Sequence, residues 1–245
     1  MMAERPLLTL NALTAAYGNT AIVKDFTLDI VSGEIVTVLG ANDSGKTTLF
    51  LALSRLIPIW SGSIWFDGHD VTALSLESLV QLGIAFLPQQ RLTFNTMSVE
   101  DNLKVGAFTL PQRSSYQMQR DYIFELFPRL AERRQHKAKH LSGGEQRLLE
   151  IARAIMSRPR LLILDQPSAG LAPYIRWQML EGLQTLKQDT GLSILILEQA
   201  IPQVMNIADR GCMLVRGMKT FEGTREELIE FADIDSHRMD RADYP

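Results

Sequence analysis

Near-continuous apolar runs alternate with amphipathic segments in the second half of the chain. Two of these runs, Leu161–Asp165 and Leu192–Glu198, are apolar at almost every position. The segment between them, Tyr174–Asp189, has the hydrophobic spacing of a helix. Strands that are apolar throughout are typical of parallel sheets with helices on both faces. The pattern therefore predicts an α/β fold built on a parallel sheet.

Shorter apolar runs with alternating polar positions characterise the N-terminal part. They predict strands over Leu7–Leu10, Ala21–Ile30, Glu34–Leu39 and Ser61–Gly68. The simplest arrangement of the N-terminal strands is an antiparallel β layer that leads into the glycine-rich segment after Leu39.

The middle of the chain, Ser98–Leu141, changes character and is predicted to be a helical insert. Helical spacing is clearest in its apolar residues Tyr122, Ile123, Leu126, Phe127 and Leu130. A solvated face is the interpretation of its basic residues, which are Arg129, Arg133, Arg134, Lys137 and Lys139. The polar tail over 233–245 is predicted to be either an edge helix or disordered.

Composition narrows the classes of partner. The chain has 245 residues, 46% of them hydrophobic, and a formal net charge of -3. This balance gives no global basic field, so nucleic acid is not an expected ligand. The apolar runs are much shorter than the ~20 residues of a membrane span. Neither a signal peptide pattern nor a disulfide partner for Cys212 is present, so we expect a cytoplasmic location and a buried structural thiol.

The segment Gly40–Thr48 matches the pattern G-x-x-x-x-G-K-[ST] and stands between a predicted strand and a helix predicted over Leu49–Leu56. Such a loop wraps phosphates with backbone N–H groups, supplies a lysine charge and offers a hydroxyl to Mg²⁺. An accidental glycine-rich turn is disfavoured by the strand and helix context. The predicted ATP or GTP contacts are Gly40, Asn42, Asp43, Ser44, Gly45, Lys46, Thr47 and Thr48, with Thr47 also a metal ligand.

A second motif, Leu141–Arg147, precedes the apolar run that ends at Asp165 and continues as Gln166-Pro167-Ser168. In this order the motifs resemble the ATP-binding cassette (ABC) family over Leu7 to Leu228. The resemblance implies an α/β P-loop NTPase fold with a RecA-like parallel core, an antiparallel β subdomain and a helical subdomain. It implies one domain, 1–245, in which 7–88 and 159–230 form the core with the β subdomain, about 89–158 the helical subdomain, and 233–245 a tail.

The resemblance also assigns Leu141–Arg147 as the signature motif. It implies that Ser142, Gly143, Gly144, Glu145 and Gln146 cap the γ-phosphate of ATP held by a second subunit. The working unit is then a dimer with two nucleotides at its interface, either a homodimer or a heterodimer with a sister ATPase subunit. A plain N-cap at Ser142, with Glu145 completing a capping box, is the other interpretation, and both can hold at once.

Four further assignments come from the resemblance. Asp165 is the Walker B aspartate that binds Mg²⁺ directly or through water, and Gln89 is the glutamine that reaches Mg²⁺ and the attacking water. Gln90 is the alternative in the neighbouring register. Tyr17 matches the aromatic residue that stacks on adenine, with a purely structural tyrosine as the alternative. The segment 168–172 occupies the position of the D loop, which crosses to the other subunit.

Three residues depart from the family pattern. Gln166 replaces the usual catalytic glutamate, and because an amide is no general base near neutral pH, hydrolysis should be slow. Gln199 stands at the position of the switch histidine. Asp43 replaces a glycine at a position that we expect to have a left-handed or near-left-handed backbone, which Asp tolerates better than most residues.

The subgroup suggested by Pro167-Ser168, Gly170–Pro173 and Glu198-Gln199 is the ATPase subunit of branched-chain amino acid importers and their urea and amide relatives. This implies membrane permease subunits and an extracytoplasmic solute-binding protein as partners, and a peripheral site on the inner face of the cell membrane. The alternatives are an ATPase of an exporter or lipid transporter, and a hydrolysis-deficient cassette that retains ATP as a regulatory switch. A DNA-repair or ribosome-associated ABC protein is disfavoured by the chain length.

Overall fold

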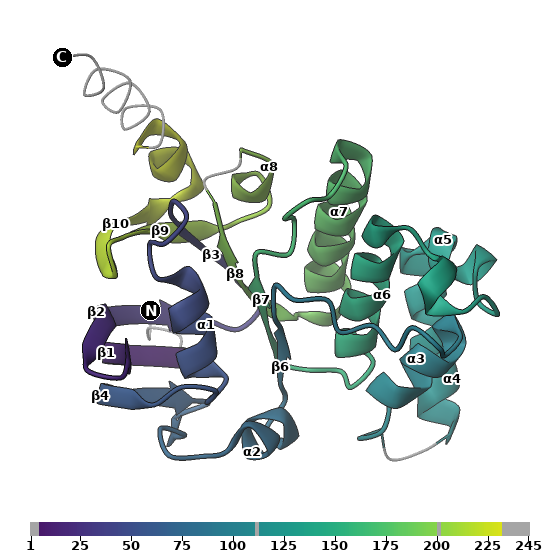
Figure 1. Cartoon of the computed structure of the whole chain (residues 1–245), viewed down its shortest axis with the longest axis horizontal. Helices are drawn as coiled ribbons and strands as arrows, with labels where there is room; N and C mark the ends of the chain where they lie inside the picture. Colours follow the sequence, from purple (N-terminus) through teal and green to yellow (C-terminus); the bar gives the residue numbers. More distant parts are fainter. Residues whose placement is uncertain (1–4, 111–112, 200–201, 232–245) are drawn as a thin grey trace.

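Two sheets and a group of helices make up the computed structural model, which describes residues 5–110, 113–199 and 202–231. A four-stranded antiparallel sheet and a six-stranded, mostly parallel sheet lie on one side, and the helices of the middle segment lie on the other (Figure 1). The predicted fold class is confirmed by this arrangement. The predicted tail over 233–245 lies outside the described residues.

The antiparallel sheet has the strand order β2-β1-β4-β5. Its strands are β1 (Leu8–Tyr17), β2 (Thr20–Ile30), β4 (Ile59–Phe66) and β5 (His69–Asp70). The first strand is longer than the predicted Leu7–Leu10. Ala12 has a positive φ of 44°, and the pairing with β2 shifts register there before it resumes at Leu13. Such a bulge breaks the alternation on which the prediction depended.

The larger sheet has the order β10-β9-β3-β8-β7-β6. Its strands are β3 (Ile35–Leu39), β6 (Ile84–Leu87), β7 (Leu161–Asp165), β8 (Ser193–Glu198), β9 (Arg210–Val215) and β10 (Met218–Thr224). All neighbours pair in parallel except β10 with β9. The sequence interpretation placed all the N-terminal strands in an antiparallel layer, but β3 belongs to the parallel sheet instead. All five of its residues are buried, because both faces of a parallel sheet are covered.

The helices that pack on these sheets include α1 (Lys46–Leu53), α2 (Leu76–Gln81), α7 (Pro173–Thr190) and α8 (Pro202–Met205), and residues 225–231 form a further helix. α1 begins and ends three residues earlier than predicted. It stops at Leu53 because Arg55 adopts a left-handed backbone with φ of 62°. α7 matches its prediction to within one residue at each end, with Pro173 in its first turn and Gly191 in the left-handed C-terminal position.

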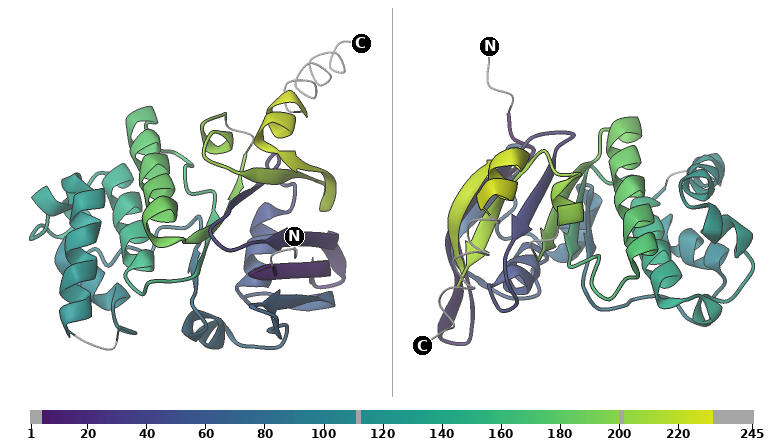
Figure 2. Two further views of the ribbon diagram at one scale, coloured as in Figure 1. Left: turned by 180° about the vertical axis from the view of Figure 1, so that it is seen from behind. Right: turned by 90° about the horizontal axis from the view of Figure 1, so that it is seen from above.

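The predicted helical insert consists of α3 (Val99–Gly106), α4 (Arg113–Leu126), α5 (Pro128–Glu132) and the 3₁₀ turn η1 (Ala138–His140). α6 (Gly143–Ile155) follows and lies between these helices and α7 (Figures 1 and 2). Buried side chains such as Leu103, Ile123, Leu130 and Leu148 share one core with β7, β8 and α7. The insert is therefore packed against the parallel sheet, not separate from it.

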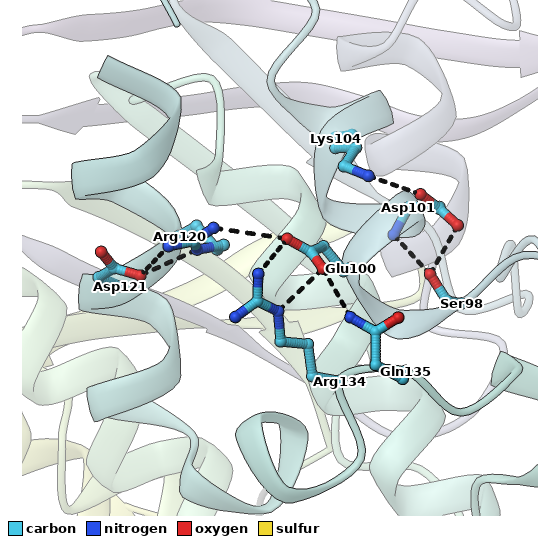
Figure 3. A network of polar contacts seen from close by, with 8 residues as sticks. All are labelled: Ser98, Glu100, Asp101, Lys104, Arg120, Asp121, Arg134 and Gln135. Atoms are coloured by element: carbon cyan, nitrogen blue, oxygen red, sulfur yellow. Dashed lines mark hydrogen bonds and ion pairs between the residues drawn. The ribbon is translucent and has the colours of Figure 1, made fainter. Parts of the chain in front are cut away.

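A network around Glu100 connects the helices of the insert (Figure 3). The Glu100 carboxylate, 8% exposed, accepts hydrogen bonds from Arg134 Nε and Nη2 at 2.8 and 2.6 Å, from Gln135 at 3.0 Å and from Arg120 at 3.4 Å. The hydrogen bond from Arg134 lowers the pKa of Glu100, and burial opposes it. The side chain of Arg134 is 40% exposed, so it is partly solvated as expected, but it also bonds a buried carboxylate that the sequence interpretation did not include.

We expect Glu100→Ala to lower the free energy of unfolding by about 1 to 3 kcal/mol, because it leaves cations around a half-enclosed site without their counter-charge. Urea unfolding measures this change. Glu132→Ala is the matched control, since Glu132 pairs with Arg129 while both side chains are more than half exposed, and its effect should stay below about 0.5 kcal/mol. Equal losses in the two variants would contradict the importance of the network.

Two sequence expectations concern membranes and the single cysteine. Within the described residues, no helix is both long and apolar enough to cross a bilayer. Cys212 on β9 is buried, and burial raises the pKa of its thiol to about 12. This confirms the prediction that the thiol is buried.

Candidate functional site

The carboxyl ends of four parallel strands meet at one edge of the larger sheet. β8 lies between β3 and β7, and β6 follows β7. The segments that leave these strands are the loop after Leu39, Asp165-Gln166, Glu198-Gln199 and Gln89. In α/β sheets this edge is where ligands bind. The topology thus brings together residues that are far apart in the sequence.

The loop between β3 and α1 depends on glycine at two positions. Gly45, directly before α1, has φ of 109°, and a Cβ on Gly40 would lie 2.4 Å from Leu214 O. Asp43 has φ of 62°, as expected from its replacement of a glycine. Because α1 begins at Lys46, the free N–H groups and the positive end of its dipole are directed at the loop.

Lys46 is enclosed by this loop and is 2% exposed. Its ammonium donates to Gly40 O at 2.9 Å, Ala41 O at 2.7 Å and Ser44 Oγ at 3.3 Å. Burial lowers the pKa of Lys46, while the nearby carboxylates of Asp165, Glu198 and Asp43 oppose that shift. A buried cation at the end of a helix N-terminus favours an anionic ligand.

A cavity of about 430 Å³ opens over the loop. Its lining comprises Tyr17, Ile22, Asn42, Asp43, Gly45, Lys46, Thr47, Thr48, Gln89 and Gln166. Tyr17 is 48% exposed at this cavity, so a face of its ring is available for stacking. Gln89 lines the cavity and Gln90 does not, which favours the first of the two registers.

Asp165 at the end of β7 has the properties of a metal ligand. The residue is 1% exposed, and its Oδ1 has no hydrogen-bond partner among the described residues. Burial raises the pKa of Asp165 to about 6, against the opposing effects of Thr47 and Lys46. An unpartnered buried carboxylate oxygen beside a threonine hydroxyl is the oxygen donor set that Mg²⁺ prefers. Asp165 and Thr47 therefore fit this ion.

We expect the Mg²⁺-dependent gain in ATP affinity to fall about fourfold from about pH 7.5 to about pH 5.5, because Asp165 takes up a proton and a carboxylic acid is a poor ligand. Titrations with Mg²⁺ and with EDTA measure this gain. Asp165→Asn should flatten the profile.

The stability of the nucleotide-free chain depends on pH in the opposite direction from the Mg²⁺-dependent affinity. The raised pKa of Asp165 keeps the proton on the folded state, so this group's contribution to stability declines as the pH rises from about 4 to about 6.

Gln166 follows Asp165 in a left-handed conformation, with φ of 43°. Its N–H donates to Leu197 O at 2.8 Å, and its Oε1 accepts from Gln89 Nε2 at 3.3 Å. Two side-chain amides therefore face each other at the cavity. Both can orient a water molecule, and neither can accept its proton near neutral pH.

Gln199 lies at the other side of the phosphate loop, where its Nε2 donates to Asn42 Oδ1 at 2.6 Å. The preceding residue, Glu198, is 1% exposed, and its carboxylate accepts from Gln199 N at 2.9 Å, from Ser168 N at 2.8 Å and from Ser168 Oγ. Glu198 thus fixes the start of the 168–172 segment beside Gln199. Sequence reasoning did not name it as a site residue, although a charge at the end of an apolar strand was a visible signal.

The residues Ser142 to Gln146 do not line this cavity. Ser142 caps α6: its Oγ accepts from Glu145 N at 3.2 Å, and Glu145 Oε2 accepts from Ser142 N at 2.8 Å. The capping box is therefore present. Ser142 and Gly143 are exposed, so the N-terminus of this helix can still receive an anion from outside the chain.

Comparison with known proteins gives the family. The model of the ABC transporter domain matches residues 23–169. The chain belongs to the ABC transporter family. This ABC cassette is an ATP-binding ATPase subunit, and such subunits work with membrane permeases.

Relatives of the cassette include ATP-binding proteins of amino acid transport and of lipopolysaccharide export. It is 38% identical to the high-affinity branched-chain amino acid transport ATP-binding protein BraG of Pseudomonas aeruginosa, over 91% of this chain and 95% of that protein. It is 32% identical to the lipopolysaccharide export system ATP-binding protein LptB of Escherichia coli, over 91% and 92%. A nucleotide-free ATP-binding cassette from an ABC transporter superposes with a TM-score of 0.82 at 25% identity, covering 92% of this chain and 94% of the other.

Proposed function

We propose that this ABC cassette is the ATP-binding subunit of a bacterial importer for branched-chain or other amino acids, or for urea or an amide. The observation that carries the proposal is the 38% identity to a branched-chain amino acid transport protein over nearly the whole of both chains. A second relative is the probable branched-chain amino acid transport ATP-binding protein LivF of Archaeoglobus fulgidus, which is 35% identical over 89% of this chain and 92% of the other. The Glu198-Gln199 pair supports the same subgroup.

ATP binds in the cavity above the phosphate loop. Tyr17 stacks on adenine, and the loop from Gly40 to Thr48 surrounds the phosphates with Lys46 at their centre. Thr47, Asp165 and Gln89 would hold Mg²⁺, which would supply positive charge next to the terminal phosphates. Gln89 and Gln166 orient the attacking water, and Gln199, released from Asn42, contacts the γ-phosphate.

The complete site needs a second subunit, identical or a sister ATPase. Ser142 to Gln146 lie outside the cavity of their own chain, and the exposed helix N-terminus caps the γ-phosphate bound by the partner. Closure of this dimer is transmitted through the segment after Gln89 to the permease. The cassette works at the inner face of the cell membrane, and a solute-binding protein delivers the solute from the other side.

Uptake of labelled leucine by cells that lack the gene tests the importer function. We expect uptake to fall, and to be restored by the unmodified gene but not by Lys46→Ala. The same assay with labelled urea and with a labelled aliphatic amide shows whether either of these compounds is the transported solute. Normal uptake of all these solutes together with a defect in the outer membrane would instead support the exporter function that the LptB relative suggests.

A second candidate function follows from the two glutamines. With Gln166 and Gln199 in place of acid and base groups, the cassette would retain ATP as a regulatory switch while a sister subunit hydrolyses. A single-turnover measurement of phosphate release distinguishes the regulatory function from the hydrolysing one. The regulatory function requires the ATP bound to this cassette to remain intact while the sister subunit completes many turnovers.

A further inference from the structure

Arg147, on the second turn of α6, contacts the backbone on both sides of the candidate water-orienting residues. The side chain is buried, with 3% of the residue exposed. Its Nη1 donates to Pro88 O at 2.9 Å, directly before Gln89. Its Nη2 and Nε donate to Asp165 O and Pro167 O, both at 3.2 Å, directly before and after Gln166. One guanidinium therefore fixes the backbone next to both glutamines.

Glu150, three residues further along α6, completes the contact. It is 1% exposed and accepts from Arg147 Nη1 at 3.1 Å. Its Oε1 accepts from Leu92 N at 2.6 Å and from Thr93 Oγ1 at 2.8 Å. The loop that carries Gln89 is thus bound to α6 on both sides of that residue, by Arg147 before it and by Glu150 after it.

Charge balance alone does not explain this pair. Burial lowers the pKa of Arg147, and the hydrogen bond and charge of Glu150 oppose that shift, which means that the pair offsets a desolvation cost. Replacement of such buried pairs by apolar residues is often neutral for stability. What an apolar pair lacks is the planar fork of donors that reaches three carbonyls in fixed directions.

In the proposed dimer, the N-terminus of α6 caps the nucleotide that the partner subunit binds. Ser142 and Gly143 at its N-terminus are exposed, and Arg91, two residues after Gln89, donates to Gly143 O. The Gln89 loop therefore contacts the same helix at its N-terminus and, through Arg147 and Glu150, one to two turns later. A helix of thirteen residues moves as a rigid body over this length.

We infer that Arg147 is a positioning residue that holds Gln89 and Gln166 in register and couples them to the signature helix, so that nucleotide bound in one site of the dimer biases the other. This inference rests on the proposed shared site, in which α6 caps the partner's ATP. It predicts two separate losses when Arg147 is removed: hydrolysis slows because the glutamines are misplaced, and cooperativity between the sites declines.

The test uses the full chain with Gln166→Glu, whose turnover is the easier to measure, and adds Arg147→Met together with Glu150→Gln. This combination removes both charges and keeps an acceptor for Leu92 N. We expect the dissociation constant of ATP to stay within about threefold, kcat to fall about tenfold or more, and the Hill coefficient for ATP to decline toward unity.

Two further variants separate positioning from stability. Arg147→Lys keeps the charge opposite Glu150 but lacks the fork, so it should not restore kcat. Arg153→Met removes another arginine of α6, one that lies over the ring of Phe94, further along the Gln89 loop, and that makes no hydrogen bond to Pro88, Asp165 or Pro167 among the described residues. It should leave kcat and the Hill coefficient unchanged. A kcat and a Hill coefficient that match the reference in the double variant, or full recovery with lysine, overturn the inference.

Failure of the proposed function gives a different result. If Gln166→Glu itself leaves turnover unchanged, the water-orienting role of residue 166 is wrong, and the unmodified chain then serves as the reference for the same comparison. If the reference shows no cooperativity, the shared site is wrong, and the coupling inferred for Arg147 is wrong with it.

Discussion

Gln166→Glu should raise the rate of ATP hydrolysis about 100-fold, within the range that a positioned general base contributes. The backbone is already in place, because Gln166 N bonds Leu197 O and the side chain faces Gln89 at the cavity. Glutamate has the same length and adds a proton acceptor. Phosphate release at saturating Mg-ATP measures the change. ATP affinity should change by less than about threefold, because in the proposed site the side chain of residue 166 orients the attacking water and does not bind the phosphates.

Gln90→Glu is the matched control. It adds the same charge one residue from Gln89, on an exposed side chain that does not line the cavity. Its turnover should equal that of the unmodified chain. Fast hydrolysis by the unmodified chain would remove the basis of this prediction, since it would require a proton acceptor other than residue 166.

The sequence predicted the elements that carry the nucleotide site because their signals are local. Leu161–Asp165 and the run ending at Glu198 are apolar at almost every position, as is typical of strands covered on both faces, and both occur in the parallel sheet. The left-handed backbone at Asp43 was predicted from the family resemblance, because Asp43 stands where the family has glycine, and the structure has it. The conformation of a motif of nine consecutive residues, such as Gly40–Thr48, depends mainly on those residues themselves.

What the sequence did not predict depends on partners far along the chain. Arg147 bonds carbonyls 18 to 59 residues away, and Glu198 bonds Ser168 across 30 residues. Arg134 was interpreted as solvated because its neighbours are polar, yet Glu100 lies 34 residues earlier and is mostly buried. Charge type and local spacing do not reveal which of several arginines meets a buried carboxylate, because the fold brings the two together.

Lys46→Ala should weaken ATP binding at least about 100-fold. Charge-assisted hydrogen bonds contribute about 1.5 to 3 kcal/mol each, and two of them to phosphate oxygens amount to about 3 to 6 kcal/mol. In the nucleotide-free chain the ammonium donates to Gly40 O and Ala41 O, so it is already held at the centre of the loop and little ordering is needed when phosphate arrives. The lower end of that range, about 3 kcal/mol, corresponds to slightly more than 100-fold, and this preorganisation is why the loss should be at least that large.

Stabilisation by ligand is the measurement that makes this loss visible. At an ATP concentration about 100 times the dissociation constant, the unmodified chain gains about 2.7 kcal/mol, whereas a variant that binds 100-fold more weakly gains only about 0.4 kcal/mol. Lys24→Ala is the control, because Lys24 is an exposed lysine on β2 that does not line the cavity, and its gain should equal that of the unmodified chain. A full ATP-dependent rise in Tm for Lys46→Ala would mean that the triphosphate binds elsewhere, and the roles assigned to Thr47 and Asp165 would be wrong with it.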